Sequence, residues 1–181
     1  PLEAESRGPT MAPAVVLKLG GGLITEKARL TTVQSDRLER LAIEIANAAQ
    51  QGVHVLVVHG AGSFGHLRAK AWGLADGRSN VQADDGCSSQ DEAVERVRAD
   101  MMALAEHVTG ALHCAGLVTS KHPPHRWAVG TGTDFLGDVS PLQPSTIIPV
   151  TWGDVVPVDG PAEFGILSGD DLVHRCAIEL P

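Results

Sequence analysis

Four short segments of the sequence combine glycine with side chains that bind anions or metal ions. They are KLGGG (18–22), HGAGSFGH (59–66), WGD (152–154) and SGDD (168–171). Glycine tolerates positive φ and lets a ligand approach the main chain closely, so successive backbone N–H groups can converge on an anion. Lysine and imidazole beside such turns add positive charge and hydrogen-bond donors. Together the four segments predict a site for phosphate groups.

Lys18 and His66 are the side chains best suited to this chemistry. Lys18 lies in an apolar run just before the first glycines. An unpartnered buried ammonium is costly, so we expect it to project from a strand end onto an anion. His66 closes the second glycine turn, where its ring can donate to a phosphate oxygen, whereas His59 is expected to be structural. The peptide groups between Gly60 and Gly65 are predicted to hold a monoester anion.

Three aspartates stand at the last two turns. Asp154, Asp170 and Asp171 can each hold a metal or orient backbone amides, and helix capping is the alternative role for Asp170 and Asp171. No G-x-x-x-x-G-K-[ST] pattern occurs. GAGSFG follows the second predicted strand and leads into no helical pattern of the expected kind, which disfavours a dinucleotide-binding turn. Phosphoryl transfer requires mainly alignment and charge neutralisation, which lysines and glycine amides supply without a covalent nucleophile.

Apolar periodicity places these turns at the ends of strands. Runs 14–22 and 53–60 are typical of buried strands that end in glycine. Between them, a helix capped by Ser35 is predicted to run to Gly52. The remaining predicted elements are a helix over 90–114, strands at 117–120, within 147–158 and at 164–167, and a helix after 168. This alternation predicts an α/β fold with a parallel sheet, with loops at 73–90 and 122–144.

Composition narrows the class of protein. The chain has 181 residues, which favours one domain, and we expect residues 1–12 to be a flexible tail before a domain over 13–181. The net charge of -8 argues against a nucleic-acid partner. The 3 cysteines form no disulfide or zinc pattern, which predicts a reducing, cytoplasmic location. No apolar run approaches membrane-spanning length, so no membrane association is expected.

The segments VLKLGGGLITEK, VVHGAGSFGH, PVTWGDVV and ILSGDDLV resemble the amino acid kinase superfamily, and within it the isopentenyl phosphate kinases. The final histidine of HGAGSFGH is the most specific feature, since it is shared with these enzymes and the related fosfomycin kinases. The resemblance covers most of residues 14–180. It implies a three-layer α/β/α sandwich with a mainly parallel sheet. It also implies transfer of the ATP γ-phosphate, with Mg²⁺, to isopentenyl phosphate, giving isopentenyl diphosphate.

The resemblance and the residue chemistry together assign roles to particular positions. Trp152 stands where relatives have a histidine, and Gly22 where serine or alanine is common. Metal ligands are left unassigned. The expected catalytic residues are Lys18, Lys27 and His66; the expected acceptor-binding residues are Gly60, Ala61, Gly65, His66, Gly153 and Asp154; and the expected ATP-binding residues are Lys18, Gly20, Gly21, Gly22, Gly62 and Asp170.

The sequence departs from the superfamily pattern in two places. Relatives continue beyond the SGDD segment into a further nucleotide-binding part, so we expect the fold to be incomplete at the C-terminus and the chain to be a poor or inactive catalyst. The stretch 135–147 is too short for the helix that relatives place there, which is expected to leave a sheet face exposed. Two alternatives stay open: a kinase for another small phosphate or phosphonate such as fosfomycin, and a catalytically inactive phosphate-binding module. A homodimer is expected by resemblance.

Overall fold

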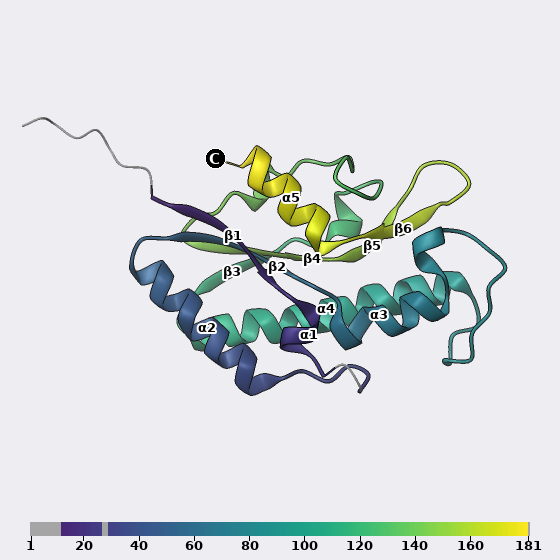
Figure 1. Cartoon of the computed structure of the whole chain (residues 1–181), viewed down its shortest axis with the longest axis horizontal. Helices are drawn as coiled ribbons and strands as arrows, with labels where there is room; N and C mark the ends of the chain where they lie inside the picture. The colour runs from purple at the N-terminus through teal and green to yellow at the C-terminus, as the bar shows by residue number, and fades with distance from the viewer. Residues whose placement is uncertain (1–11, 27–28, 181) are drawn as a thin grey trace, which may run out of the picture.

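Four parallel strands form the centre of the molecule, in the order β1-β2-β4-β3 (Figure 1). The computed structural model describes residues 12–26 and 29–180. A separate antiparallel hairpin of β5 and β6 follows β4. The strands are β1 (Ala14–Leu19), β2 (His54–His59), β3 (Val118–Lys121), β4 (Ile147–Trp152), β5 (Asp154–Pro157) and β6 (Phe164–Leu167).

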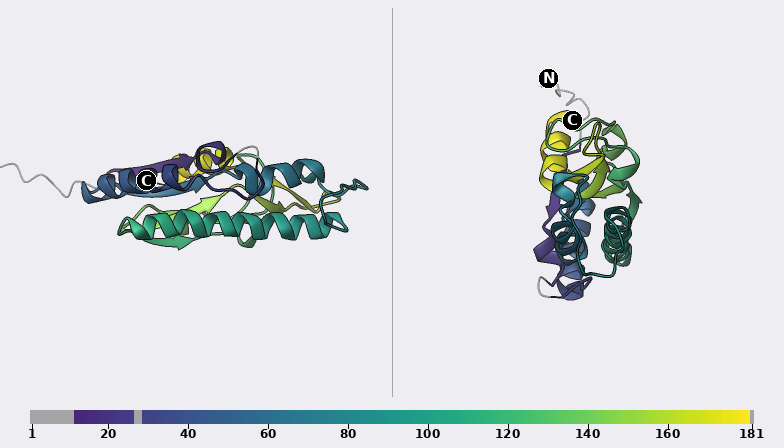
Figure 2. Two further views of the ribbon diagram at one scale, coloured as in Figure 1. Left: turned by 90° about the horizontal axis from the view of Figure 1, so that it is seen from below. Right: turned by 90° about the vertical axis from the view of Figure 1, so that its right-hand side faces the viewer.

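Helices cover both faces of this sheet, so the expected three-layer α/β/α arrangement is confirmed (Figures 1 and 2). Alternate residues of β2 show the two faces: Val55 and Val57 belong to one buried cluster, Leu56 and Val58 to the other. The first face carries α2 (Ser35–Gln50), α3 (Gly62–Ala71) and α4 (Gln90–Cys114), and the second carries α5 (Gly169–Glu179). Short helical turns complete the fold: α1 (Gly21–Ile24), η1 (Leu74–Asp76), η2 (Pro124–Arg126) and η3 (Ser140–Leu142).

The register of the sheet brings the glycine turns together. Leu19 pairs with His59, and His59 pairs with Trp152, so three strands end level with one another. Backbone bonds continue beyond the strands: Gly60 N–H donates to the Leu19 carbonyl at 2.9 Å, and Gly153 N–H to the His59 carbonyl at 3.1 Å. The turns after β1, β2 and β4 therefore emerge side by side at the carboxyl edge, where open α/β sheets bind ligands.

The elements predicted from periodicity are present, but α3 was not predicted. The second glycine segment was expected to be a turn as far as His66, whereas the helix begins at Gly62 and places His66 inside it. Small residues and glycines give α3 no apolar stripe, and packing against α4 stabilises it instead. The helix predicted from a Ser35 cap begins one residue earlier than expected, since Ser35 is itself the first helical residue.

The expectation of an exposed sheet face beside 135–147 was wrong. The irregular segment itself covers this face, because Phe135, Val139 and Leu142 are buried in one cluster with Leu172 of α5. Arg175 of α5 reinforces the cover: its guanidinium lies 4.3 Å from the Phe135 ring centroid and donates to the Gly137 carbonyl at 2.8 Å. Apolar side chains from a loop thus replace a helix.

The expected flexible tail and the expected lack of a membrane-spanning segment can be compared with the structure only over the described residues. Residues 1–11 of the expected flexible tail, and Pro181 at the other end, lie outside the described residues. None of the helices formed by the described residues combines the length and hydropathy needed to cross a bilayer.

Candidate active site

The first two glycine turns pack against each other at backbone distance. A Cβ added at Gly21 would lie 2.1 Å from the Gly62 nitrogen and 2.6 Å from its Cα. Gly62 has φ +51, and a Cβ there would lie 2.1 Å from the Thr25 hydroxyl oxygen. Neither position has room for a side chain, so these glycines hold α1 and the start of α3 in direct contact.

Thr25 connects the two turns through hydrogen bonds, and its role was not predicted from the sequence. Its side chain is fully buried. The hydroxyl donates to the Gly21 carbonyl at 2.8 Å and accepts from Ser63 N–H at 3.0 Å. Ala61 precedes α3 and has no side chain able to cap it, so Thr25 satisfies one free N–H of that helix from a distant part of the chain.

Residues expected to bind the acceptor line one pocket of about 490 Å³. This volume falls in the range of small-molecule sites. The structure therefore brings together eight of the expected residues, from β1, from the second glycine segment and from the last two turns. They are Lys18, Gly60, Ala61, Gly65, His66, Gly153, Asp154 and Asp170.

Three of the residues expected to bind ATP line a neighbouring pocket of about 450 Å³. Gly21, Gly22 and Gly62 belong to this second pocket, which shares Ala61 and His66 with the first. Gly20 is not among the residues lining either pocket. Lys27, expected to be catalytic, lies outside the described residues.

Lys18 and Asp170 form an ion pair at the mouth of the first pocket. The Lys18 ammonium lies 2.5 Å from the Asp170 carboxylate, and the Asp170 side chain is 78% exposed. Asp171 instead forms a capping box with Ser168, whose hydroxyl accepts from Asp171 N–H at 3.1 Å. Asp171 therefore takes the capping role that was considered for both aspartates, while Asp170 pairs with Lys18 at the pocket.

Two helices begin at this pocket. Ser168 and Gly169 at the start of α5 line it, as do Ala61 and Gly65 from the first turn of α3. Helix N-termini carry partial positive charge and favour anions. The backbone supplies fewer free donors than the glycine count suggests, because Gly60, Ser63 and Phe64 N–H groups bond within the protein. Within the second glycine segment, these bonds leave the N–H groups of Ala61 and Gly62 at the start of α3.

His66 projects from α3 and is exposed, and it lines both pockets.

Asp154 differs from His66, because its side chain is fully buried. Its Oδ2 accepts from His125 Nδ1 at 2.7 Å, and its Oδ1 accepts from Val155 N–H at 2.9 Å. The carboxylate therefore ties η2 to the turn between β4 and β5. His125 was not singled out in the sequence, where it lies in an irregular segment.

His59 is buried, as expected for a structural residue. Its ring stacks on Trp152 with centroids 5.4 Å apart. Burial lowers the pKa of His59 to about 4, although the bond between Nδ1 and the Gly60 carbonyl opposes the shift. Since a carbonyl only accepts, Nδ1 carries the proton and the ring is neutral at pH 7.

The first pocket has apolar walls beyond Lys18, although Lys70 and Asp76 also line it. α4 runs antiparallel to α3, since Gln90 bonds to the Trp72 carbonyl while Met101 lies beside Gly65. Val97 and Met101 of α4 and Ile166 of β6 form the apolar walls. A ten-residue helix spans about 15 Å, so the pocket extends along α3 from the charged end to η1.

No group of three or more His, Cys, Asp or Glu side chains able to hold a metal ion occurs among residues 12–26 and 29–180. Metal ligands, left unassigned from the sequence, therefore stay unassigned.

The fold and the site define the class of protein: the chain belongs to the amino acid kinase family, whose model matches residues 13–180. Its curated relatives are isopentenyl phosphate kinases. The enzyme of Methanothermobacter thermautotrophicus is 30% identical over 172 residues, which is 92% of this chain and 63% of the relative. The enzyme of Methanocaldococcus jannaschii is 27% identical over 177 residues, covering 91% of this chain and 64% of the relative.

Solved structures give the same result. An isopentenyl phosphate kinase structure superimposes with a TM-score of 0.78 at 28% identity, covering 92% of this chain and 67% of that one. The product complex of the Thermoplasma acidophilum isopentenyl phosphate kinase gives 0.73 at 26% identity, covering 91% of this chain and 64% of that one. The chain spans 61% to 64% of the length of its curated relatives.

Proposed function

We propose that the chain binds isopentenyl phosphate and ATP as the two substrates of a phosphoryl transfer. An oxygen of the acceptor monophosphate would attack the γ-phosphorus. The new P–O bond forms as the bond to the β,γ-bridging oxygen breaks, giving isopentenyl diphosphate and ADP. The curated relatives carry the name of this activity, and they match over most of the chain.

One observation carries the proposal: a single pocket combines an anion-binding end with apolar walls. Lys18 and the first turns of α3 and α5 surround one end, and Val97, Met101 and Ile166 supply the apolar walls. A phosphate monoester with a short hydrocarbon tail has the same combination of charge and apolar surface. Fosfomycin, the alternative acceptor considered from the sequence, lacks a tail that would lie along the apolar walls.

Each site residue then has a physical role. The Lys18 ammonium neutralises charge on the phosphate groups, and Asp170 holds it at the pocket mouth. His66 donates to the acceptor phosphate from the wall shared by the two pockets. ATP supplies the transferred phosphoryl group. The side-chain-free cradle of Gly21, Gly22 and Gly62 fits its phosphates, and Mg²⁺ would be held largely by those phosphates, as is usual for this ion.

The first experiment is a turnover assay of the full chain with ATP, Mg²⁺ and isopentenyl phosphate. Formation of isopentenyl diphosphate would support the kinase. Calorimetry separates this from the inactive phosphate-binding module: binding of isopentenyl phosphate without binding of ATP would favour the module. Isopentenyl phosphate that neither binds nor reacts would refute the proposal.

Replacement of His66 is predicted to weaken acceptor binding while the fold survives. Because hydrogen bonds to charged groups contribute about 1.5–3 kcal/mol, His66→Ala should raise the dissociation constant for isopentenyl phosphate at least about tenfold. His113→Ala is the matched control, since His113 is also an exposed helical histidine but lies outside both pockets. Undiminished affinity in His66→Ala, measured by calorimetry, would contradict the assigned role.

Lys18→Ala is predicted to weaken ATP binding about tenfold and to reduce turnover about a hundredfold, because one charge-stabilising donor is lost. Lys121→Ala provides the comparison. Like Lys18, Lys121 lies at the carboxyl end of a parallel strand and pairs with a carboxylate, that of Glu106, but it does not line either pocket. Equal effects of the two substitutions would show that Lys18 acts only through the net charge of the protein and not through contact with the phosphate groups.

Two broader expectations belong to the same proposal. The three cysteines, Cys87, Cys114 and Cys176, are free thiols, which supports a reducing compartment such as the cytoplasm. A homodimer stays a prediction, to be measured by sedimentation of the full chain.

A further inference from the structure

The turn after α3 closes the apolar end of the candidate pocket. Gly73, Ala75 and Asp76 line the pocket there, and η1 (Leu74–Asp76) forms the wall. Gly73 has no side chain and that of Ala75 is a methyl group, so beside them the backbone itself forms the barrier. Where the turn lies therefore decides how far the pocket extends.

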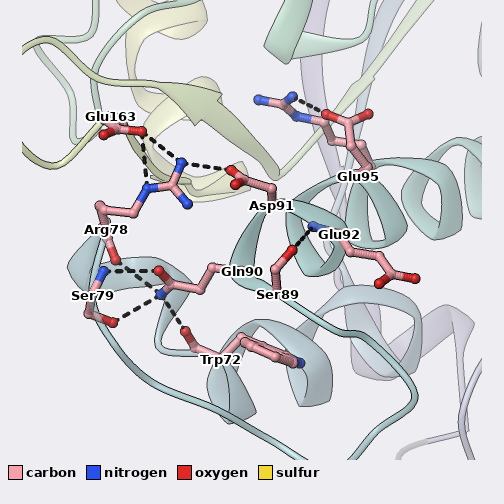
Figure 3. A network of polar contacts seen from close by, with 11 residues as sticks. Trp72, Arg78, Ser79, Ser89, Gln90, Asp91, Glu92, Glu95 and Glu163 are labelled. Atoms are coloured by element: carbon pink, nitrogen blue, oxygen red, sulfur yellow. Dashed lines mark hydrogen bonds and ion pairs between the residues drawn. The ribbon is translucent and has the colours of Figure 1, made fainter.

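Gln90, the first residue of α4, holds both ends of this turn (Figure 3). Its side chain is 5% exposed. The amide nitrogen donates to the Trp72 carbonyl at 2.8 Å and to the Gly77 carbonyl at 3.2 Å. The amide oxygen accepts from Ser79 N–H at 2.9 Å. One buried amide thus fixes the backbone on either side of η1.

Arg78 ties the same segment to the β5–β6 hairpin and to α4. Its Nη2 donates to Glu163 Oε2 at 2.7 Å and to Asp91 Oδ1 at 2.6 Å (Figure 3). Its guanidinium also lies 5.0 Å from the Phe164 ring centroid. Arg78 N–H also donates to the Ala162 carbonyl at 2.8 Å. The arginine thereby links the two other elements that supply the apolar walls.

The backbone beside Arg78 has no room to shift toward the hairpin. Gly77 has φ +78, and a Cβ there would lie 2.8 Å from both the Cβ and the carbonyl oxygen of Ala162. η1 is thus packed directly against the hairpin loop, and movement of the wall requires the loss of the Arg78 or Gln90 contacts.

We propose that Arg78 and Gln90 are positioning residues that set the maximum length of the acceptor's apolar tail, by holding Leu74–Asp76 as the end wall of the pocket. This inference rests on the proposed function, since it concerns the tail of the same acceptor. Neither side chain is among those lining the pocket, so both act through the turn.

The test compares calorimetric dissociation constants of the full chain for prenyl monophosphates with five and ten carbons. Arg78→Ala and Gln90→Met should each reduce the preference for the five-carbon ligand at least about fivefold, chiefly by tighter binding of the longer ligand. Arg175→Ala is the matched control. Arg175 also pairs with a glutamate and lies over a phenylalanine ring, but it is remote from η1 and should leave the preference within about twofold.

The outcomes separate the inference from the function on which it rests. A wild-type chain that binds neither ligand would refute the proposed function, and this inference with it. A wild-type chain that binds the five-carbon ligand, with the preference unchanged in both variants, would overturn the positioning role alone. Loss of affinity for both ligands in equal proportion would overturn it too, because that is the effect of general destabilisation. Faster amide hydrogen exchange at Leu74–Asp76 should accompany the changed preference.

Discussion

Gly21→Ala should destabilise the protein by several kcal/mol, about 3 or more, whereas Gly20→Ala should cost less than about 0.5 kcal/mol. The added methyl group at Gly21 would lie 2.1 Å from the Gly62 nitrogen, and backbone atoms on both sides cannot move aside. A methyl group at Gly20 meets no atom within 4 Å, and the residue has φ -58, which alanine adopts freely. Urea unfolding, followed by tryptophan fluorescence, measures both free energies.

Comparison of these two variants distinguishes the loss of close packing in the folded protein from the effect of alanine on the flexibility of the unfolded chain. The two glycines are adjacent, so any effect of alanine on the unfolded chain is similar in both. A free energy of unfolding within about 1 kcal/mol of wild type for Gly21→Ala would mean that the contact between α1 and α3 is not required for the fold. The anion-binding ends of both pockets depend on that contact.

Acidification from pH 6.5 to pH 4 is expected to remove about 3 kcal/mol of stability through His59 alone. Burial lowers the pKa of His59 from 6.5 to about 4, so in this range the unfolded chain binds a proton that the folded chain does not. Stability from this residue is fully present above pH 6.5, is lost as the pH falls, and changes no further below about pH 4. Unfolding free energies measured in urea at several pH values give the slope.

A variant isolates this histidine from other titrating groups. Bonds to their partners lower the pKa values of Asp91, Glu92 and Asp138. Protonation of these carboxylates at lower pH therefore destabilises wild type and variant alike. His59→Phe keeps a ring beside Trp152 but cannot titrate, so its profile should be flatter between pH 4 and 6.5. Parallel profiles for wild type and His59→Phe would show that His59 is not the source.

Much of the architecture follows from periodicity because parallel strands buried on both faces are continuous apolar runs. β1 and β2 are such runs, and α4 has a regular apolar stripe beginning at Ala93. α3 escaped prediction because its sequence, GSFGHLRAKA, has no stripe and contains two glycines. Contact with α4 and the remote cap from Thr25 decide its conformation, and neither is local in sequence.

The candidate site divides in the same way. Glycine turns at strand ends revealed Lys18, His66 and Asp170, because the carboxyl edge of a parallel sheet gathers whatever follows its strands. Arg78, Gln90 and His125 act through partners that are distant in sequence or lie in irregular segments, so no spacing marks them. The sequence places Gln90 at the start of a predicted helix, but its burial is known only from the fold.

The ion pair between Lys18 and Asp170 also bears on when binding becomes possible during folding. These residues stand 152 positions apart, on the first strand and on the last helix. Parallel pairing of distant segments is slow to form, since a long loop must close before any contact rewards it. A chain still emerging from the ribosome therefore lacks the Asp170 side of this pocket until α5 has been synthesised. Ligand capture through this ion pair thus requires the chain from β1 through α5.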